Sequence, residues 1–195
     1  MDTMIKRILR AIALLALAAV PLAFADKLAS VSLERLTHDS DVVFVGRAEK
    51  QDLVKGGFVV IDVDGRQKSL DVAITAFSID ESLKGSNQSA AYVCSIVNPL
   101  KYADIEPGKT YILFLQQAGK YLQRTYGSMS QIEIDGGKVT AHYFNGTDKS
   151  LETPESIKTA VLHSVPQSKG RVRNTPYNPY AMAPYKIVKN ACVGT

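Results

Sequence analysis

The two cysteines are the residues whose chemistry is easiest to anticipate. Cys94 and Cys192 are the only cysteines among the 195 residues, and an even pair in an oxidising compartment usually forms a disulfide. Cys94 lies in an apolar run typical of a strand, and Cys192 lies in the tail. We therefore expect a bond that fastens the tail to the body. A buried free Cys94 beside a loose Cys192 is the alternative.

The three histidines, His38, His142 and His163, are the candidates for general bases. Nucleophilic catalysis needs a Ser or Cys that such a base can activate, and the sequence contains neither a Gly-x-Ser-x-Gly elbow nor a Cys-His signature. We place His38 and His163 at helix ends, where an imidazole commonly caps carbonyls, and His142 on the exposed face of a hairpin. No catalytic residue is predicted, and enzymatic activity stays an open question.

Metal and cofactor motifs are absent from the sequence. A zinc site would require His or Cys ligands three or four residues apart, and none are. Asp62, Asp64 and Asp71 could hold calcium, but the glycine and distal Glu of an EF-hand loop are missing, so a solvated strand end is the better interpretation. There is no phosphate-cradling or dinucleotide-binding glycine pattern. We therefore predict no metal and no cofactor.

The tail carries an uneven charge. Residues 156–195 contain six cations and no acid, interleaved with tyrosines, and such a segment could contact a polyanion such as nucleic acid, lipid headgroups or acidic glycan. The candidate anion contacts are Lys169, Arg171, Arg173, Lys186 and Lys189. Because the preceding body is net negative, we favour a tail that packs back on the body. A periplasmic or extracellular protein partner is a further possibility; no specific nucleic-acid motif is present.

The first 25 residues have the three parts of a secretory signal. Lys6, Arg7 and Arg10 precede an apolar run at residues 11–20, and Ala23-Phe24-Ala25 forms a cleavage site. A retained membrane anchor is the competing interpretation, but the run is shorter than the ~20 residues of a spanning helix. We expect a periplasmic or secreted chain that begins at Asp26, without a transmembrane anchor.

The elements that must position these residues are mostly strands. A Pro107-Gly108 turn precedes the apolar residues 111–115, which predict a central strand buried on both faces. The Ala118-Gly119 step then allows a reversal into a second, half-polar strand. This hairpin is expected to start a β-rich core.

Further strands are predicted on either side of it. Residues 42–48 and 58–63 indicate two separate strands, with Gly46 marking a bulge or a close backbone approach. The Asp64-Gly65 turn predicts a hairpin into residues 70–79. Residues 131–143 predict another hairpin, with Ile132 and Ile134 buried and Gln131 and Glu133 in water. Residues 98–104 are expected to form a surface loop.

Two helices complete the prediction. Residues 30–38 form a short helix that Ser30 or Ser32 can cap. Residues 153–163 form a second, with Thr153 as N-cap and Pro154 at the first helical position. This helix should lie against the barrel or plug one end of it. The Pro-Tyr dipeptides beyond Pro166 indicate extended chain.

These elements define a mainly β fold. We predict a small closed or partly open antiparallel β-barrel with a short N-terminal helix, one C-terminal helix and an extended tail. The expected organisation is a signal peptide at residues 1–25, a barrel domain at 26–165 and a basic Pro/Tyr-rich tail at 166–195 that packs on the barrel.

Three stretches together carry a resemblance, namely Ser40 to Arg47, Ile79 to Gly85 and Pro107 to Leu115. Their pattern resembles that of bacterial exported domains with a tissue-inhibitor-of-metalloproteinases-like OB barrel, and the similarity covers residues 33–139. It implies an OB-like barrel. The animal inhibitors chelate a protease's zinc through an N-terminal cysteine, whereas the expected N-terminus here is Asp26-Lys27-Leu28. That mode of inhibition is therefore not implied.

We expect the chain to be an exported, non-enzymatic binding or interaction module of unknown ligand. OB barrels usually bind on the face of their second and third strands, which fold analogy places at residues 58–79. One alternative is a hydrolase assembled from distant strands, with His142 or a carboxylate pair in a pocket. The other is an inhibitor of an exported protease that uses the loop at residues 98–104.

Overall fold

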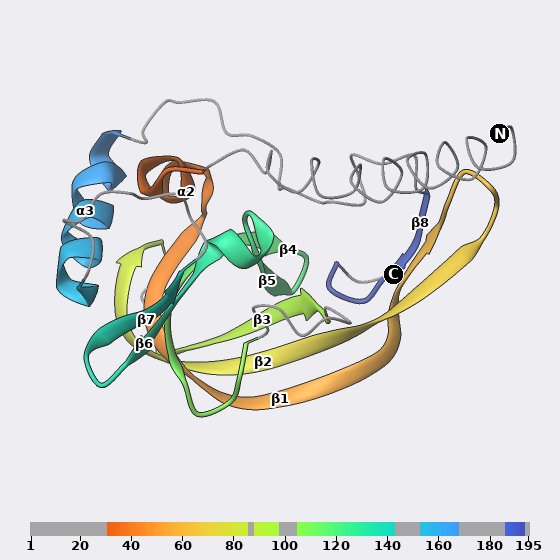
Figure 1. The fold of residues 1–195 in the computed structure, drawn as a ribbon, viewed down its shortest axis with the longest axis horizontal. Helices are drawn as coiled ribbons and strands as arrows, with labels where there is room; N and C mark the ends of the chain where they lie inside the picture. The colour runs from red at the N-terminus through yellow and green to blue at the C-terminus, as the bar shows by residue number, and fades with distance from the viewer. Residues whose placement is uncertain (1–30, 86–87, 98–104, 143–152, 168–185, 194–195) are drawn as a thin grey trace, which may run out of the picture. The chain divides into compact units, whose positions relative to one another are not determined.

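The structure is a computed structural model that describes residues 31–85, 88–97, 105–142, 153–167 and 186–193. These residues form a mainly β fold with two α-helices (Figure 1). The elements are α2 (Leu33–Asp39), β1 (Val42–Ile61), β2 (Gln67–Lys84), β3 (Ala90–Ile96), β4 (Thr110–Ala118), β5 (Tyr121–Arg124), the 3-10 turn η2 (Gly127–Ser130), β6 (Gln131–Asp135), β7 (Lys138–His142), α3 (Pro154–Gln167) and β8 (Lys186–Asn190).

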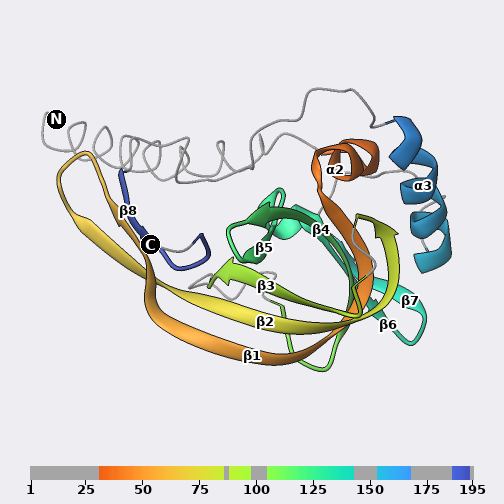
Figure 2. The same cartoon turned by 180° about the vertical axis from the view of Figure 1, so that it is seen from behind.

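The eight strands form one mixed sheet in the order β7-β6-β4-β5-β3-β2-β1-β8. An additional pairing of β4 with β1 brings five of the strands, β1, β2, β3, β5 and β4, into a partial ring (Figures 1 and 2). Every pairing is antiparallel except that of β3 with β5, which is parallel through Val93↔Leu122 and Cys94↔Gln123. The prediction of a wholly antiparallel sheet is therefore wrong at this pair.

β1 is a single strand of 20 residues, so the prediction of two strands at residues 42–48 and 58–63 is wrong. The polar stretch between them stays paired to β2. A register shift separates Val54↔Val72 from Phe58↔Leu70, and Gly56 adopts a positive φ of 58° there. A bulge of this kind bends a strand without ending its pairing, which is why a polar, Gly-containing stretch looks like a loop in the sequence.

Gly46 marks a bulge and a close approach, as predicted. The register of β1 against β2 shifts between Val45 and Gly46. A Cβ at Gly46 would lie 2.5 Å from the carbonyl oxygen of Ser78, which is a backbone atom that cannot rotate away. β1 therefore approaches β2 at a distance that only glycine allows.

The predicted central strand is confirmed as β4. Its residues 111–115 are fully buried, and the strand pairs with β1, β5 and β6. Tyr111, Leu113 and Leu115 pack in one cluster with Phe44 and Phe77. The alternate residues of the strand, Ile112 and Phe114, belong to a second cluster that includes Leu36 of α2 and Ile157 and Val161 of α3. One strand thus joins two cores.

The hairpin of β6 and β7 is also confirmed, but one of its side chains was placed wrongly. Ile132 is fully buried, as expected, yet Gln131 is buried as well. Arg124 of β5 donates a 2.6 Å hydrogen bond to Oε1 of Gln131. A buried amide is tolerated when it has such a partner, and the alternation of residue types along a strand does not show that the partner exists.

Both helices form near the predicted residues. Ser32 caps α2 by accepting from the Arg35 amide, and Thr153 accepts from the Ser156 amide at the start of α3. α3 continues past the predicted residue 163 and includes Pro166, whose ring nitrogen cannot donate to a preceding carbonyl. The two helices lie side by side, α2 against β4 and α3 against β2 (Figures 1 and 2). No helix of the described residues is long and apolar enough to cross a membrane.

A disulfide joins Cys94 of β3 to Cys192, just after β8, as predicted. Its sulfurs lie in a third apolar cluster that includes Phe58, Val60 and Val72. The Ala191 amide donates to the carbonyl of Gly57 at 2.8 Å. The described end of the tail is thus held by a covalent bond, by strand pairing and by packing.

Candidate functional site

The most concentrated group of polar side chains lies at the C-terminal end of α2 and centres on Asp39. The Asp39 carboxylate is fully buried. It accepts hydrogen bonds from Arg35 Nε at 2.7 Å and from the Tyr126 hydroxyl, and it lies 2.6 Å from His38 Nδ1. The Asp39 carbonyl accepts from the Gln116 side chain of β4 at 2.6 Å. This network fixes α2 to the ring.

The pKa of Asp39 reflects two opposing effects. Burial alone raises the pKa of the carboxyl, but the hydrogen bonds from Tyr126, His38 and Arg35 outweigh burial and hold the pKa below its ordinary value. Asp39 is therefore ionised at neutral pH. A buried, ionised carboxylate with three side-chain partners stabilises a fold when all of its partners are in place.

His38 does not cap a helix carbonyl, so that prediction is wrong. Its Nδ1 faces Asp39 while its Nε2 is buried and has no hydrogen-bond partner. An aspartate that orients an imidazole is part of a catalytic triad, but here the second nitrogen meets no nucleophile among the described residues. His38 and Asp39 are neighbours on α2, and their contact belongs to the network that joins α2 to β4.

The C-terminal end of α2 is capped by β2. Nζ of Lys84, the last residue of β2, donates to the carbonyls of Thr37, His38 and Ser40 at 2.6, 3.3 and 2.7 Å. A cation is favourable at this end because the last carbonyls of a helix lack internal partners and carry the negative end of its dipole. The Leu83-Lys84-Gly85 stretch is therefore a helix anchor.

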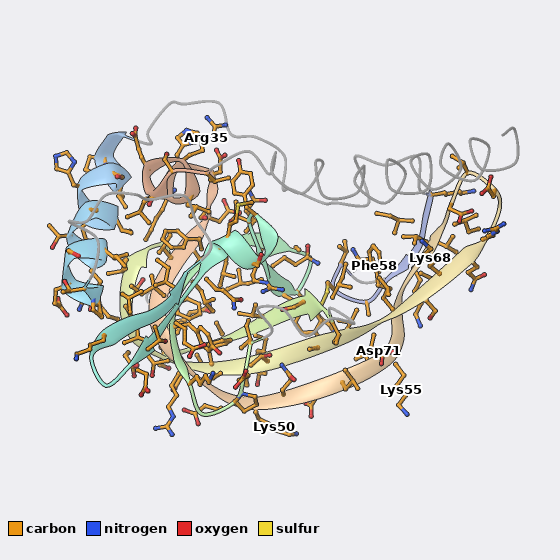
Figure 3. All side chains as sticks on the ribbon, in the orientation of Figure 1. Arg35, Lys50, Lys55, Phe58, Lys68 and Asp71 are labelled. Carbon is orange, nitrogen blue, oxygen red and sulfur yellow. A yellow bond between two sulfur atoms is a disulfide. The ribbon has the colours of Figure 1, made fainter. Side chains whose placement is uncertain are left out.

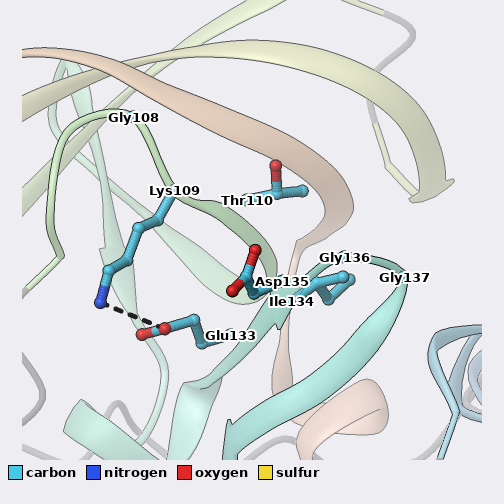
Figure 4. A pocket seen from close by; sticks show the side chains of 8 residues that line it. All are labelled: Gly108, Lys109, Thr110, Glu133, Ile134, Asp135, Gly136 and Gly137. Carbon is cyan, nitrogen blue, oxygen red and sulfur yellow. Dashed lines mark ion pairs between the residues drawn. The ribbon is translucent and has the colours of Figure 1, made fainter.

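A shallow hollow of about 440 Å³ lies between the turn before β4 and the β6–β7 hairpin (Figure 4). Lys109 dominates it and bridges the carboxylates of Glu106 and Glu133 at 3.0 and 3.1 Å. The hydrogen bonds that Lys109 donates to these two carboxylates raise the pKa of Lys109. One cation and two carboxylates leave this group with a net charge of −1, and Lys109 is held between the two acids.

Metal-binding geometry is also missing from the described residues, where no three His, Cys, Asp or Glu side chains come together. Asp62, one of the three aspartates considered for calcium, accepts from the amides of Asp64 and Arg66 at 3.0 and 2.8 Å. Asp71 accepts from the Gly56 amide at 2.9 Å. These two carboxylates stabilise turns of the backbone, in agreement with the interpretation of a strand end.

Exposed side chains concentrate on a three-stranded ribbon, which we define as residues 54–72 of β1 and β2 together with residues 186–193. β8 pairs with β1 at Phe58–Ile61. It lies along the same edge of β1 that pairs with β4 at residues 42–47. Figure 3 shows Phe58 and Lys68 on the side of the ribbon where β8 lies, and Lys50 and Lys55 pointing away from it. The ribbon extends the sheet beyond the ring.

The ribbon is cationic. It carries five cations, Lys55, Arg66, Lys68, Lys186 and Lys189, and three carboxylates, Asp62, Asp64 and Asp71. All five cations are exposed, and four of them, Lys55, Arg66, Lys186 and Lys189, form no ion pair with any described residue. Two of the three carboxylates are engaged by backbone amides. Five cations against three carboxylates give this surface a net charge of +2.

A second exposed surface surrounds Tyr92 of β3, whose side chain is 59% exposed. Tyr92 is paired with Ala76 of β2, and Ala76 with Lys50 of β1. Lys50 is already paired with Asp52 at 2.9 Å. The lysine nearest to Tyr92 in this register is therefore already engaged by a carboxylate.

The structure covers the predicted site residues unevenly. Lys186 and Lys189 lie exposed on β8, but Lys169, Arg171 and Arg173 fall outside the described residues, as does the loop at residues 98–104. The backbone of His142 is opposite Ile132 at the end of β7. His163 is exposed on α3 before its last turn, so its predicted place at the helix end is wrong, because the helix continues to Gln167. The structure thus describes two of the five candidate anion contacts, and their role stays a prediction.

Sequence reasoning missed the Asp39 network because its members are far apart in the chain. Tyr126 is 87 residues from Asp39, and Gln116 is 77. The i, i+4 spacing of Arg35 and Asp39 on a helix was the one available signal. The comparisons with protein families and with curated proteins found no family model and no protein that matches the chain.

Proposed function

We propose that the chain is an exported, non-enzymatic binding module in which an OB-like barrel presents the ribbon to a ligand. The five-strand ring supports the OB-like part of this proposal, because an OB barrel is a five-stranded, partly open ring. The disulfide and the signal-like leader of the sequence support export.

One observation carries the proposal. Four exposed cations of the ribbon, Lys55, Arg66, Lys186 and Lys189, form no ion pair with a described residue, whereas the central charged groups near the helices and in the hollow have partners. Asp39, Lys84 and Lys109 each have hydrogen-bond partners inside the fold. The ribbon is therefore the surface with unused interaction capacity.

The ribbon overlaps the contact region expected from fold analogy, but the contacting residues differ. Phe58 and Val72 are buried and serve the core around the disulfide. The exposed residues of that stretch are 63–69, at the hairpin tip and the start of β2. A ligand would therefore meet the distal half of the expected region together with β8.

The proposal can be tested by mapping where soluble polymers touch the oxidised protein. Amide NMR shifts would be recorded with polygalacturonate, neutral dextran, single-stranded DNA and an unfolded polypeptide. We expect at least one of them to shift signals of residues 54–72 and 186–193. Shifts confined to α2, to the β6–β7 hairpin or to the surface around Tyr92 would overturn the proposal.

The same samples distinguish binding from hydrolysis. Each polymer would be incubated with the protein and its chain length measured afterwards. An unchanged length is expected for a binding module. Shortening that persists in Lys186→Gln/Lys189→Gln but is lost on changing Glu133 or His142 would instead support the hydrolase alternative.

A further inference from the structure

A β-bulge in β8 places two lysines on the same face of the ribbon. Lys186 is opposite Ile61 and Lys189 is opposite Val59, with a register shift between Val59 and Val60. Residues three apart face opposite ways in a regular strand. Val188 is the additional residue of the bulge and shifts the alternation of side chains by one position. Both lysines therefore share a face with Val59 and Ile61.

The same face continues across β1 onto β2. Ser69 is opposite Val59 and Gln67 is opposite Ile61, so a hydroxyl and an amide lie in line with the two lysines. Gln67, Ser69 and both lysines are exposed. The face therefore offers two cations on β8 and two neutral hydrogen-bonding groups two strands away.

The bulge and the lysines also disfavour pairing of β8 with a second strand. Bulges and edge lysines are common devices that prevent edge-to-edge association of sheets. A second copy of this strand would bring more lysines to the same place. The partner is thus better sought on the face of the ribbon than along its edge.

We infer that this face binds a linear acidic polysaccharide, an inference that rests on the proposed binding function. Lysines without described ion pairs complement the carboxylates of such a polymer, and Gln67 and Ser69 can bond its hydroxyls. Within the described residues of the ribbon the one aromatic side chain, Phe58, is buried. The described residues of the ribbon therefore offer no exposed aromatic ring of the kind on which nucleobases stack.

Polygalacturonate is a suitable probe, with neutral dextran and poly-dT as comparison polymers. Binding to immobilised, oxidised protein would be measured at about 20 and 200 mM salt. We expect polygalacturonate to bind more tightly than poly-dT of equal charge, with weaker binding at the higher salt because ions screen exposed charges. Dextran should not bind.

Two matched double variants separate the lysine pair from net charge. Lys186→Gln/Lys189→Gln removes the pair, and Arg47→Gln/Lys138→Gln removes two exposed cations, one on the part of β1 that pairs with β4 and one on β7. Both change the net charge equally. We expect the first to weaken polygalacturonate binding about tenfold and the second to leave it nearly unchanged. Equal losses would overturn the inference.

An exchange variant tests the geometry at constant composition. Ile187 is opposite Val60, on the other face from Lys189. Ile187→Lys/Lys189→Ile therefore moves one lysine to the opposite face without changing the charge. Binding should weaken severalfold, with the near-UV circular dichroism and the disulfide retained; unchanged binding would overturn the inference.

The remaining outcomes separate the inference from the proposed function. If the ribbon signals shift with the unfolded polypeptide or with dextran but not with polygalacturonate, the binding function survives and the acidic ligand is wrong. If poly-dT binds more tightly than polygalacturonate, the ligand class is nucleic acid. If no polymer shifts the ribbon signals, both proposals fail.

Discussion

Nζ of Lys84 lies 2.6 Å from the carbonyl oxygen of Thr37, so the end of a long strand caps the end of the helix that precedes the sheet. The same ammonium reaches the carbonyl of Ser40. Gly85 follows with a φ of 90°, and a Cβ there would lie 2.6 Å from the carbonyl oxygen of Asp41. β2 therefore ends beside the short connection between α2 and β1, so α2, β1 and β2 meet at one place.

Removing the cap should loosen α2 selectively. Lys84→Met keeps the aliphatic stem but loses the hydrogen bonds to three carbonyls, and we expect a loss of about 1 to 2 kcal/mol in the free energy of unfolding. Urea unfolding measures the loss, and hydrogen exchange should increase in α2 before the ring. Lys138→Met, at an exposed position on β7, is the control and should change stability little.

The Asp39 network should be sensitive to substitution. Asp39→Asn leaves Arg35 and His38 facing a neutral group in a buried place, and we expect a loss of about 3 kcal/mol at pH 7. Asp64→Asn, in the exposed hairpin turn, is the matched control. Similar losses in the two variants would show that burial and partners at Asp39 contribute nothing.

The network also predicts a pH dependence. The pKa of Asp39 is lower in the folded protein than its ordinary value, which is about 3.9 in an unfolded chain. Its ionised form therefore stabilises the fold above about pH 4, and this contribution falls as the pH drops through the folded-state pKa. The stability gap between the natural protein and Asp39→Asn should narrow below pH 4. A gap that is constant from pH 7 to pH 2.5 would contradict the lowered pKa.

The disulfide should stabilise the fold through the tail. Cys94 and Cys192 are separated by 98 residues, and closing a loop of that length contributes up to about 4 to 5 kcal/mol in the chain-entropy model. Cys94→Ser/Cys192→Ser should unfold at lower denaturant and lose exchange protection in β8 first. Protection of α2 and α3 should persist, because Leu36, Ile157 and Val161 pack in a different cluster.

Gly46 and Gly65 can be compared to separate the cost of a steric contact from the cost of an unfavourable backbone conformation. Gly46→Ala places a Cβ 2.5 Å from the Ser78 carbonyl oxygen and should cost about 2 kcal/mol. Gly65 has open space around it but a φ of 75°, so Gly65→Ala should cost about 1 kcal/mol through backbone strain alone. Thermal unfolding of both variants tests this order; the reverse order would mean that β1 can move away from β2.

The sequence predicted those parts of the fold that depend on neighbouring residues. The Asp64-Gly65 turn, the Thr153 cap and the buried residues of β4 are local signals of turn, helix start and apolar run. Gly46 was predictable for a similar reason, since glycine inside a strand indicates a bulge or a close approach. The disulfide followed from the count of cysteines.

The rest depends on contacts between distant residues. β1 continues through a polar stretch because β2 pairs with it, and Gln131 is buried because Arg124 bonds it. The Lys186 and Lys189 face depends on a register shift that no local pattern indicates. Asp39 gathers partners from β4 and from the chain after β5. Residue types alone could not show which of these groups would meet.

The strand pairings that form the ring differ greatly in the number of residue pairs they contain. β1 and β2 match along fifteen residue pairs, whereas β3 and β5 match along only two. The shortest pairing, β3 with β5, is also the parallel one, and Cys94 is one of its paired residues. The ring can open there with the loss of fewer residue pairs than at any of its other strand pairings, and the disulfide joins the end of the chain to the strand that would move.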